Sequence, residues 1–119
     1  MLAKHLQKIL SNIQEITVDE LLKKMQENKP FYLIDVREEA EWRLGTIPEA
    51  NCITRGTLEL HLEKLTSDEQ ADIVLYCGGG TRSALATDSL EAMGYKNVKS
   101  LKGGFRAWKE KSLATTTTI

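Results

Sequence analysis

The chain has 119 residues, and its 16 Lys and Arg against 17 Asp and Glu give a formal net charge of −1. This length suits one domain that buries about two-thirds of the surface its unfolded chain exposes, so folding needs neither a disulfide nor a structural metal. The lysines are scattered among glutamates instead of forming a stripe, which excludes a nucleic-acid partner or an anionic membrane surface.

The two cysteines lie in different contexts, and no secretory pattern precedes them. Thiols in that arrangement are typical of a reducing compartment. The first fourteen residues alternate polar and apolar side chains too often for a signal-peptide core, and no apolar run reaches membrane-spanning length. We therefore expect a soluble, cytoplasmic protein.

Apolar residues recur at helical spacing near the start of the chain: Leu2, Leu6, Ile9, Leu10 and Ile13. The spacing predicts an amphipathic helix over residues 1–12 that packs on the domain. The alternative is a helix that binds in a partner's groove.

Helices and strands then alternate. Thr17 and Glu20 match a capping box, so a second helix begins there and ends before Pro30. Residues 31–34 form a continuous apolar run that predicts a strand covered on both faces. Residues 38–44 predict a short helix, and residues 50–53 a short strand.

Charged residues follow these strands, at the edge where sites in open parallel sheets collect. Asp35 and Arg37 end the first apolar strand, and Arg55 comes after the second. Asp35 and Arg37 are candidates for catalysis, although a charged pair at a strand end is more often a structural ion pair that positions loops. We expect Arg55 to face the loop described next.

That loop joins the apolar run 73–76 to a stretch with helical spacing, 83–93. It reads Cys77, Gly78, Gly79, Gly80, Thr81, Arg82, Ser83. Three glycines allow turns that point several N–H groups into one concavity, and the following helix adds the positive end of its dipole. Arg82 adds a cation. The loop thus predicts an anion site around a Cys77 thiolate, and we interpret Cys77 as a nucleophile in partly open surroundings.

The second cysteine, Cys52, has no glycine cradle, so we expect it to be a small core residue. The rival hypothesis is a resolving thiol, which requires Cys52 to approach Cys77 to disulfide distance. No residue with metal-ligand spacing accompanies His5 or His61, so we expect no metal site.

The C-terminal part supplies one more strand, over 98–101, and a helix that follows Gly103 and Gly104. Paired glycines there allow close approach to a neighbouring loop. Trp108 on that helix is expected in the core, with its N–H needing a partner. Residues 113–119 predict a disordered tail. The alternation as a whole predicts an α/β domain with a mainly parallel sheet.

Four blocks together resemble a single-domain rhodanese, in order and in spacing: residues 33–37 (LIDVR), 45–50 (GTIPEA), 77–83 (CGGGTRS) and 101–108 (LKGGFRAW). The resemblance implies a three-layer rhodanese-like fold with a five-stranded, mainly parallel sheet flanked by helices. It places the domain at residues 13–112, after the helix of residues 1–12 and before the tail.

The resemblance also implies a sulfurtransferase. Cys77 would take a sulfane sulfur from thiosulfate or a persulfide, hold it as a persulfide, and pass it to a thiol or cyanide acceptor, or to a protein acceptor. Residues 78–83 would supply amides, Arg82 and Arg55 would attract the donor, and Asp35 and Arg37 would support the site. No cofactor is implied, and we expect a monomer.

Some residues depart from the family pattern. Thr46 stands where histidine is common, and Glu49 stands where glycine is. Gly78 stands where many thiosulfate-using members have a basic residue, which predicts poor use of thiosulfate. The alternatives left open are a phosphatase or arsenate reductase of the same fold, whose loop is one residue longer, and a non-catalytic interaction or sulfur-relay module. The spacing of a nucleotide-binding P-loop is absent.

Overall fold

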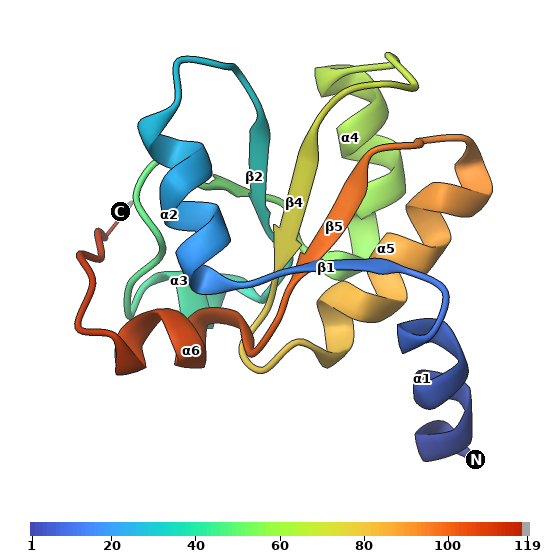
Figure 1. The fold of residues 1–119 in the computed structure, drawn as a ribbon, viewed down its shortest axis with the longest axis horizontal. Helices are drawn as coiled ribbons and strands as arrows, with labels where there is room; N and C mark the ends of the chain where they lie inside the picture. Colours follow the sequence, from blue (N-terminus) through green and yellow to red (C-terminus); the bar gives the residue numbers. More distant parts are fainter. Residues whose placement is uncertain (118–119) are drawn as a thin grey trace.

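The structure, a computed structural model, describes residues 1–117. One five-stranded sheet with the order β1-β5-β4-β2-β3 runs through the molecule, and all its strand pairs are parallel (Figure 1). The strands are β1 (Gln14–Ile16), β2 (Tyr32–Asp35), β3 (Asn51–Cys52), β4 (Ile73–Tyr76) and β5 (Val98–Leu101). The predicted parallel sheet and its implied five strands are confirmed.

Helices cover both faces of this sheet. They are α1 (Leu2–Leu10), α2 (Val18–Gln26), α3 (Glu39–Trp42), α4 (Leu58–Leu65), α5 (Thr81–Met93) and α6 (Gly104–Glu110), with a short 3₁₀ turn η1 (Arg55–Thr57) before α4. In Figure 1, α2, α3 and α6 lie on one side, and α4 and α5 on the other. None of the described helices combines the length and the apolar character that crossing a membrane requires.

The central strand β4 divides the core. All four of its residues are buried, and they alternate between two apolar clusters. Ile73 and Leu75 pack with α4 and α5, whereas Val74 and Tyr76 pack with α2 and α6. A strand buried on both faces explains the continuous apolar run in the sequence.

Strand β1 has no counterpart among the strands expected from local pattern. It is a three-residue edge strand, and Gln14 and Glu15 are exposed. Only Ile16 is buried, so the strand carries no apolar alternation to detect. These residues form a strand because they pair in parallel with β5, with Gln14 opposite Lys99.

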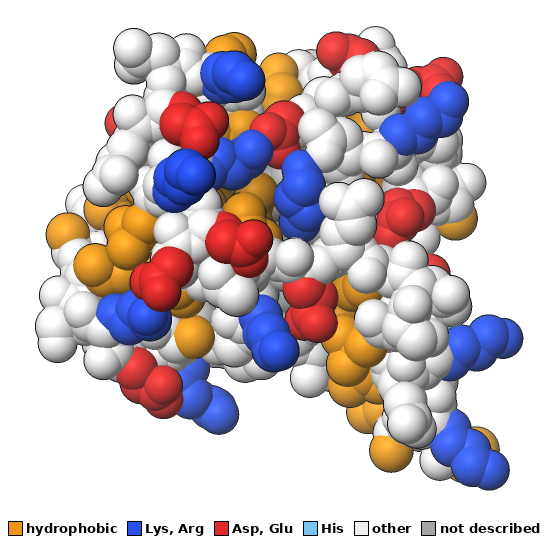
Figure 2. Space-filling model, viewed as in Figure 1, with side chains coloured by type: hydrophobic (Ala, Val, Ile, Leu, Met, Phe, Trp, Pro, Cys, Tyr) orange, Lys and Arg blue, Asp and Glu red, His pale blue; other side chains and the backbone are white. Residues whose placement is uncertain are grey.

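The helix expected at the N-terminus forms as α1. Ile9 is its one buried residue, whereas Leu2 and Leu10 remain 59% and 38% exposed. Figure 2 shows apolar side chains along the side of this helix that is turned toward the body of the domain. The helix therefore packs on the domain through a small part of its apolar face.

The short helix expected over residues 38–44 is confirmed over a single turn, Glu39–Trp42. Its Trp42 is half-buried, and the indole Nε1 is buried without a hydrogen-bond partner among the described residues. The second tryptophan, Trp108, is in the core and donates from Nε1 to the carbonyl oxygen of Ala114 at 2.8 Å.

That bond belongs to the segment expected to be a disordered tail. Thr116 also exchanges two backbone hydrogen bonds with Thr46, at 2.8 and 3.0 Å, as an isolated antiparallel bridge. Residues 113–116 thus lie on the domain, which differs from the prediction, because the indole N–H of a buried tryptophan needs the acceptor that this segment supplies. Residues 118–119 of the predicted tail lie outside the described residues.

Candidate active site

The Cys77 loop lies at the edge formed by the carboxyl ends of the strands. Cys77 directly follows β4, and α5 begins four residues later at Thr81. Gly80 caps this helix with a φ of +108°, a left-handed conformation that favours glycine. The loop thus turns at the residue where the sequence permits it, and the first turn of α5 faces the thiol.

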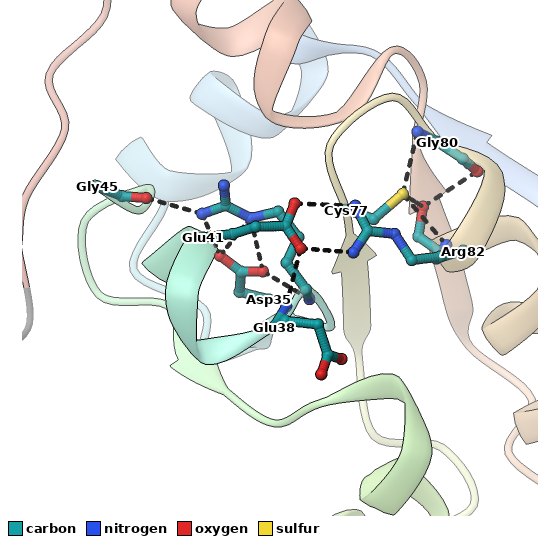
Figure 3. A network of polar contacts seen from close by, with 9 residues as sticks. Asp35, Glu38, Glu41, Gly45, Cys77, Gly80 and Arg82 are labelled. Atoms are coloured by element: carbon teal, nitrogen blue, oxygen red, sulfur yellow. Dashed lines mark hydrogen bonds and ion pairs between the residues drawn. The ribbon is translucent and has the colours of Figure 1, made fainter. Parts of the chain in front are cut away.

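Three groups of the chain lie within hydrogen-bond distance of the sulfur. The Gly80 N–H donates to Cys77 Sγ at 3.1 Å, the Ser83 N–H at 3.4 Å, and the Ser83 hydroxyl is 3.5 Å away (Figure 3). Donors at a helix start favour negative charge on the sulfur. Of the amides expected from residues 78–83, those of Gly80 and Ser83 are the two that point at Cys77.

The thiol itself is covered. Cys77 is 1% exposed, so the partly open surroundings expected for it are not what the structure shows. A hollow of about 350 Å³ lies over the outside of the loop. Its lining residues are Arg37, Glu41, Gly78, Gly79, Arg82, Phe105, Arg106 and Lys109.

Arg82 was expected to be a cation available to a donor, and the structure pairs it with Glu41 instead. Its Nη1 and Nη2 lie 2.7 and 3.0 Å from Oε1 and Oε2 of Glu41 (Figure 3). Hydrogen bonds from Arg82 lower the pKa of Glu41 to about 2. Most of the Arg82 charge is therefore balanced within the protein. Local pattern in the sequence gives no signal for this pair, because the two residues are far apart in the chain.

Two further cations line the hollow and were not singled out in the sequence. Arg106 and Lys109 both come from α6. Lys109 Nζ lies 4.9 Å from the Phe105 ring centroid, and no ion pair involves either cation among the described residues. Arg106 belongs to the GGFRAW block of the sequence. That block indicated the fold and did not mark Arg106 as a site residue.

Asp35 and Arg37 form a buried ion pair. Arg37 Nη2 is 2.9 Å from Asp35 Oδ2 and donates to the Gly45 carbonyl oxygen at 2.7 Å. The Arg37 guanidinium also lies 4.4 Å from the Phe105 ring centroid. The pair thus ties the end of β2 to the turn after α3 and to α6. This geometry matches the structural alternative, in which the pair positions loops around the site.

Arg55 lies away from the hollow. It belongs to η1, and its Nη1 is 3.0 and 2.9 Å from the two carboxylate oxygens of Glu59. Glu59 also accepts a hydrogen bond from Ser89 at 2.7 Å, which joins α4 to α5. The structure therefore does not bring Arg55 together with the other predicted site residues.

The paired glycines approach the loop as expected. A Cβ at Gly104 would lie 2.4 Å from the Cys77 carbonyl oxygen and 2.9 Å from the Gly78 carbonyl carbon. In that space Phe105 N donates to the Cys77 carbonyl at 2.8 Å, and Arg106 N donates to the Gly78 carbonyl at 3.0 Å. The start of α6 thereby holds the loop from outside.

Cys52 is not placed to resolve a disulfide with Cys77. Asp35 of β2 pairs with Cys52 on one side and with Tyr76 on the other. Two strand spacings, about 9.6 Å, separate Cys52 from Tyr76, the residue before Cys77. This exceeds the Cα separation of about 7 Å that a disulfide tolerates. Cys52 is half-buried at the edge of the sheet, less covered than the core position expected for it.

Comparison with known proteins identifies the architecture. The model of the rhodanese-like domain matches residues 17–111. The chain belongs to the rhodanese-like family. The family match covers the Cys77 loop and every strand except β1.

Individual relatives agree with this assignment. The chain is 31% identical over 96 residues to a sulfurtransferase of Allochromatium vinosum, covering 81% of this chain and 88% of the relative. The polysulfide-sulfur transferase homodimer of Wolinella succinogenes has a TM-score of 0.81 and 28% identity, with 95% of this chain and 85% of that one covered.

A third similar structure carries a different description. It is a protein of unknown function from Rhodopseudomonas palustris, described as a possible tyrosine phosphatase. Its TM-score is 0.84 at 29% identity, and the match covers 98% of this chain and 94% of that one, so it includes α1.

Proposed function

We propose that this rhodanese-like protein is a sulfurtransferase in which Cys77 carries the sulfur. The observation that supports the proposal best is the set of donors on Cys77 Sγ from Gly80 and Ser83. Donors in that arrangement stabilise a thiolate, and they would likewise stabilise an anionic persulfide. The sulfurtransferase names of the relatives from Allochromatium and Wolinella support the same reaction class.

The reaction proceeds in two displacements. In the first, the Cys77 thiolate attacks the sulfane sulfur of the donor, an S–S bond forms, and the donor's own bond to that sulfur breaks. With thiosulfate, sulfite leaves with the bonding electron pair. In the second, an acceptor thiolate or cyanide attacks the outer sulfur of the persulfide, and Cys77 leaves as a thiolate. No external oxidant or cofactor is needed.

The donor would approach from the hollow lined by Arg106 and Lys109. Arg37 is balanced by Asp35, and Arg82 is balanced by Glu41, so these two α6 cations carry most of the local positive charge. They would hold an anionic part of the donor while the buried thiol reacts beneath the loop. We propose thiol persulfides as better donors than thiosulfate, because position 78 is glycine and Arg82 is already paired.

The setting proposed for this reaction is a reducing compartment such as the cytoplasm, since Cys77 has to stay a thiol to accept sulfur. The protein would act as a monomer on small donors, with a small thiol, cyanide or a protein thiol as the acceptor.

Mass spectrometry tests the proposal. Incubation of the full chain with thiosulfate or a persulfide donor should add one sulfur to Cys77, and later exposure to cyanide should remove it. The matched control is Cys52→Ser, which should take up the sulfur as the wild type does, whereas Cys77→Ser should not. If the Cys77 thiol stays unmodified with every donor, the proposal is wrong.

The second candidate is a phosphatase, because of the description attached to the Rhodopseudomonas structure. The loop weighs against it. Only four residues, 78–81, separate Cys77 from Arg82, which is a smaller ring than the phosphatase branch uses. In addition, Glu41 occupies the guanidinium that would bind a phosphoryl group. Phosphate release that is lost in Cys77→Ser would favour this candidate over sulfur transfer.

A further inference from the structure

The hydroxyl of Ser100 lies directly behind the Cys77 loop. Ser100 belongs to β5, is 1% exposed, and has its Oγ 2.8 Å from Ser83 Oγ. The Ser83 hydroxyl in turn lies 3.5 Å from Cys77 Sγ. We propose that Ser100 is a positioning residue that stabilises the Cys77 thiolate through Ser83. The inference rests on the proposed role of Cys77 as the sulfur carrier.

Strand geometry puts Ser100 in this place. Side chains alternate across a strand, so Ser100 shares a face of the sheet with Val98, on the side that packs against α5. Register places Ser100 opposite Leu75, two residues before Cys77. Ser100 is thus a polar residue on a face of the sheet that is otherwise apolar, and its side chain points at the first turn of α5. Ser83 lies in that turn and is fully buried.

The direction of the hydrogen bond follows from where each proton can go. Each serine hydroxyl has one proton to donate. Among the residues that the structure describes, Ser83 Oγ is the single partner of the Ser100 hydroxyl. Were Ser83 to donate to Ser100, the Ser100 proton would be buried without an acceptor, which is unfavourable. Ser100 therefore donates to Ser83.

This direction leaves the Ser83 proton for two other acceptors. They are Cys77 Sγ at 3.5 Å and the Gly80 carbonyl oxygen at 3.3 Å. An ionised sulfur is the stronger acceptor, because a charged partner roughly doubles the strength of a hydrogen bond. Each bond in such a chain polarises the next, so the bond that Ser83 receives strengthens the one it gives to the thiolate.

The charged groups around the loop are separate from this chain of hydroxyls. They are Asp35, Arg37, Glu41, Arg82, Arg106 and Lys109. None of them contacts Ser100, and Ser100→Ala leaves every one in place. A change in Cys77 ionisation in that variant would thus come from the hydroxyl chain.

The experiment measures how much of Cys77 is thiolate, from the ultraviolet absorbance of the thiolate at neutral pH relative to high pH. A Cys52→Ala background leaves one thiol to titrate. Ser100→Ala should lower this ratio about twofold, as loss of one modest hydrogen bond would, and Ser83→Ala should lower it further. In Ser83→Ala, adding Ser100→Ala should change nothing more, since the path is already cut.

Thr87→Val is the matched control. Thr87 is also fully buried on α5, and its hydroxyl donates to the Ser83 carbonyl at 2.8 Å without leading to the sulfur. The thiolate absorbance ratio of Thr87→Val should equal that of the wild type. Circular dichroism should confirm that all variants fold. An unchanged ratio in Ser100→Ala, an equal fall in Thr87→Val, or a Ser100→Ala effect that persists without Ser83 would each overturn the inference.

The test also separates this inference from the function itself. The absorbance is measured without any sulfur donor. If Cys77 failed to take up sulfur while the hydroxyl chain behaved as expected, the proposed function would fall and the role of Ser100 in thiolate stabilisation would stand.

Discussion

The guanidinium of Arg82 and the carboxylate of Glu41 meet side by side, with two N–O distances of 2.7 and 3.0 Å. Arg82 lies in the first turn of α5 beside the thiol loop, and Glu41 lies on α3, so the pair joins two helices across the mouth of the hollow. A paired guanidinium has little charge left over for a donor. We therefore expect Glu41 to limit how strongly the site attracts anionic donors.

Glu41→Gln should raise kcat/KM for thiosulfate about threefold, because it removes a negative charge beside a dianionic donor. Glutamine keeps the shape of the side chain and can still accept the Glu38 N–H bond, which is 3.0 Å long in the native protein. A monoanionic alkyl persulfide should gain roughly half as much in free energy, since the Coulomb energy scales with the donor's charge.

Steady-state kinetics with both donors provides the measurement. Glu39→Gln is the control, because Glu39 lies on the same helix but pairs with Arg43 at the exposed surface. Equal gains for the two donors, or an equal gain in Glu39→Gln, would argue against the electrostatic explanation.

The same pair predicts a pH-dependent stability. Hydrogen bonds from Arg82 hold the pKa of Glu41 at about 2, below its usual 4.5. A carboxylate with a depressed pKa stabilises the fold above its unfolded pKa and loses that contribution as the pH falls through its folded value. Both side chains are more than one-third exposed, so the contribution at neutral pH is small, about 0.5 kcal/mol.

Urea unfolding of the wild type and Glu41→Gln at several pH values checks this expectation. The wild type should be the more stable above about pH 5, and the difference should shrink toward zero as the pH approaches 2. A difference in unfolding free energy that grows on acidification would contradict the assigned sign.

Gly104→Ala should damage both stability and the site. A Cβ there would lie 2.4 Å from the Cys77 carbonyl oxygen, and the φ of +58° is itself unfavourable for alanine. We expect a loss of about 2 kcal/mol or more in unfolding free energy, because backbone has to move on both sides. Slower sulfur uptake by Cys77 should accompany it, since the loop loses its support from α6.

Gly56→Ala is the matched control for this substitution. A Cβ at Gly56 would meet nothing within 4 Å, so it should leave stability nearly unchanged. Thermal unfolding of the two variants under identical conditions gives the comparison. Similar melting temperatures for the two would show that the close approach of α6 to the loop is not needed.

Arg106→Gln together with Lys109→Gln should raise the KM for thiosulfate several-fold and reduce its dependence on salt. The physical reason is that these two cations are the ones lining the hollow without a carboxylate partner among the described residues. Arg43→Gln, which alters an exposed cation at the C-terminal end of α3, is the control. A KM that does not respond to loss of the two α6 cations would place the donor elsewhere.

Short-range features of this protein follow from the sequence alone. The capping box at Thr17, the buried strand β4 and the glycine turn after Cys77 depend on neighbours a few residues away, through backbone conformation and hydrogen bonds within one turn. The close approach at Gly104 was also foreseeable, because only glycine fits such a contact. These features suffice to identify the family and to single out Cys77.

The partners of the site residues were decided by tertiary structure. The sequence left Arg82 as an available cation, but the sheet order brings Glu41 against it from another helix. Strand register, and not local pattern, puts Ser100 behind Ser83. The physical reason is that charge pairing and burial act through space, so they depend on which distant segments the packed core makes neighbours.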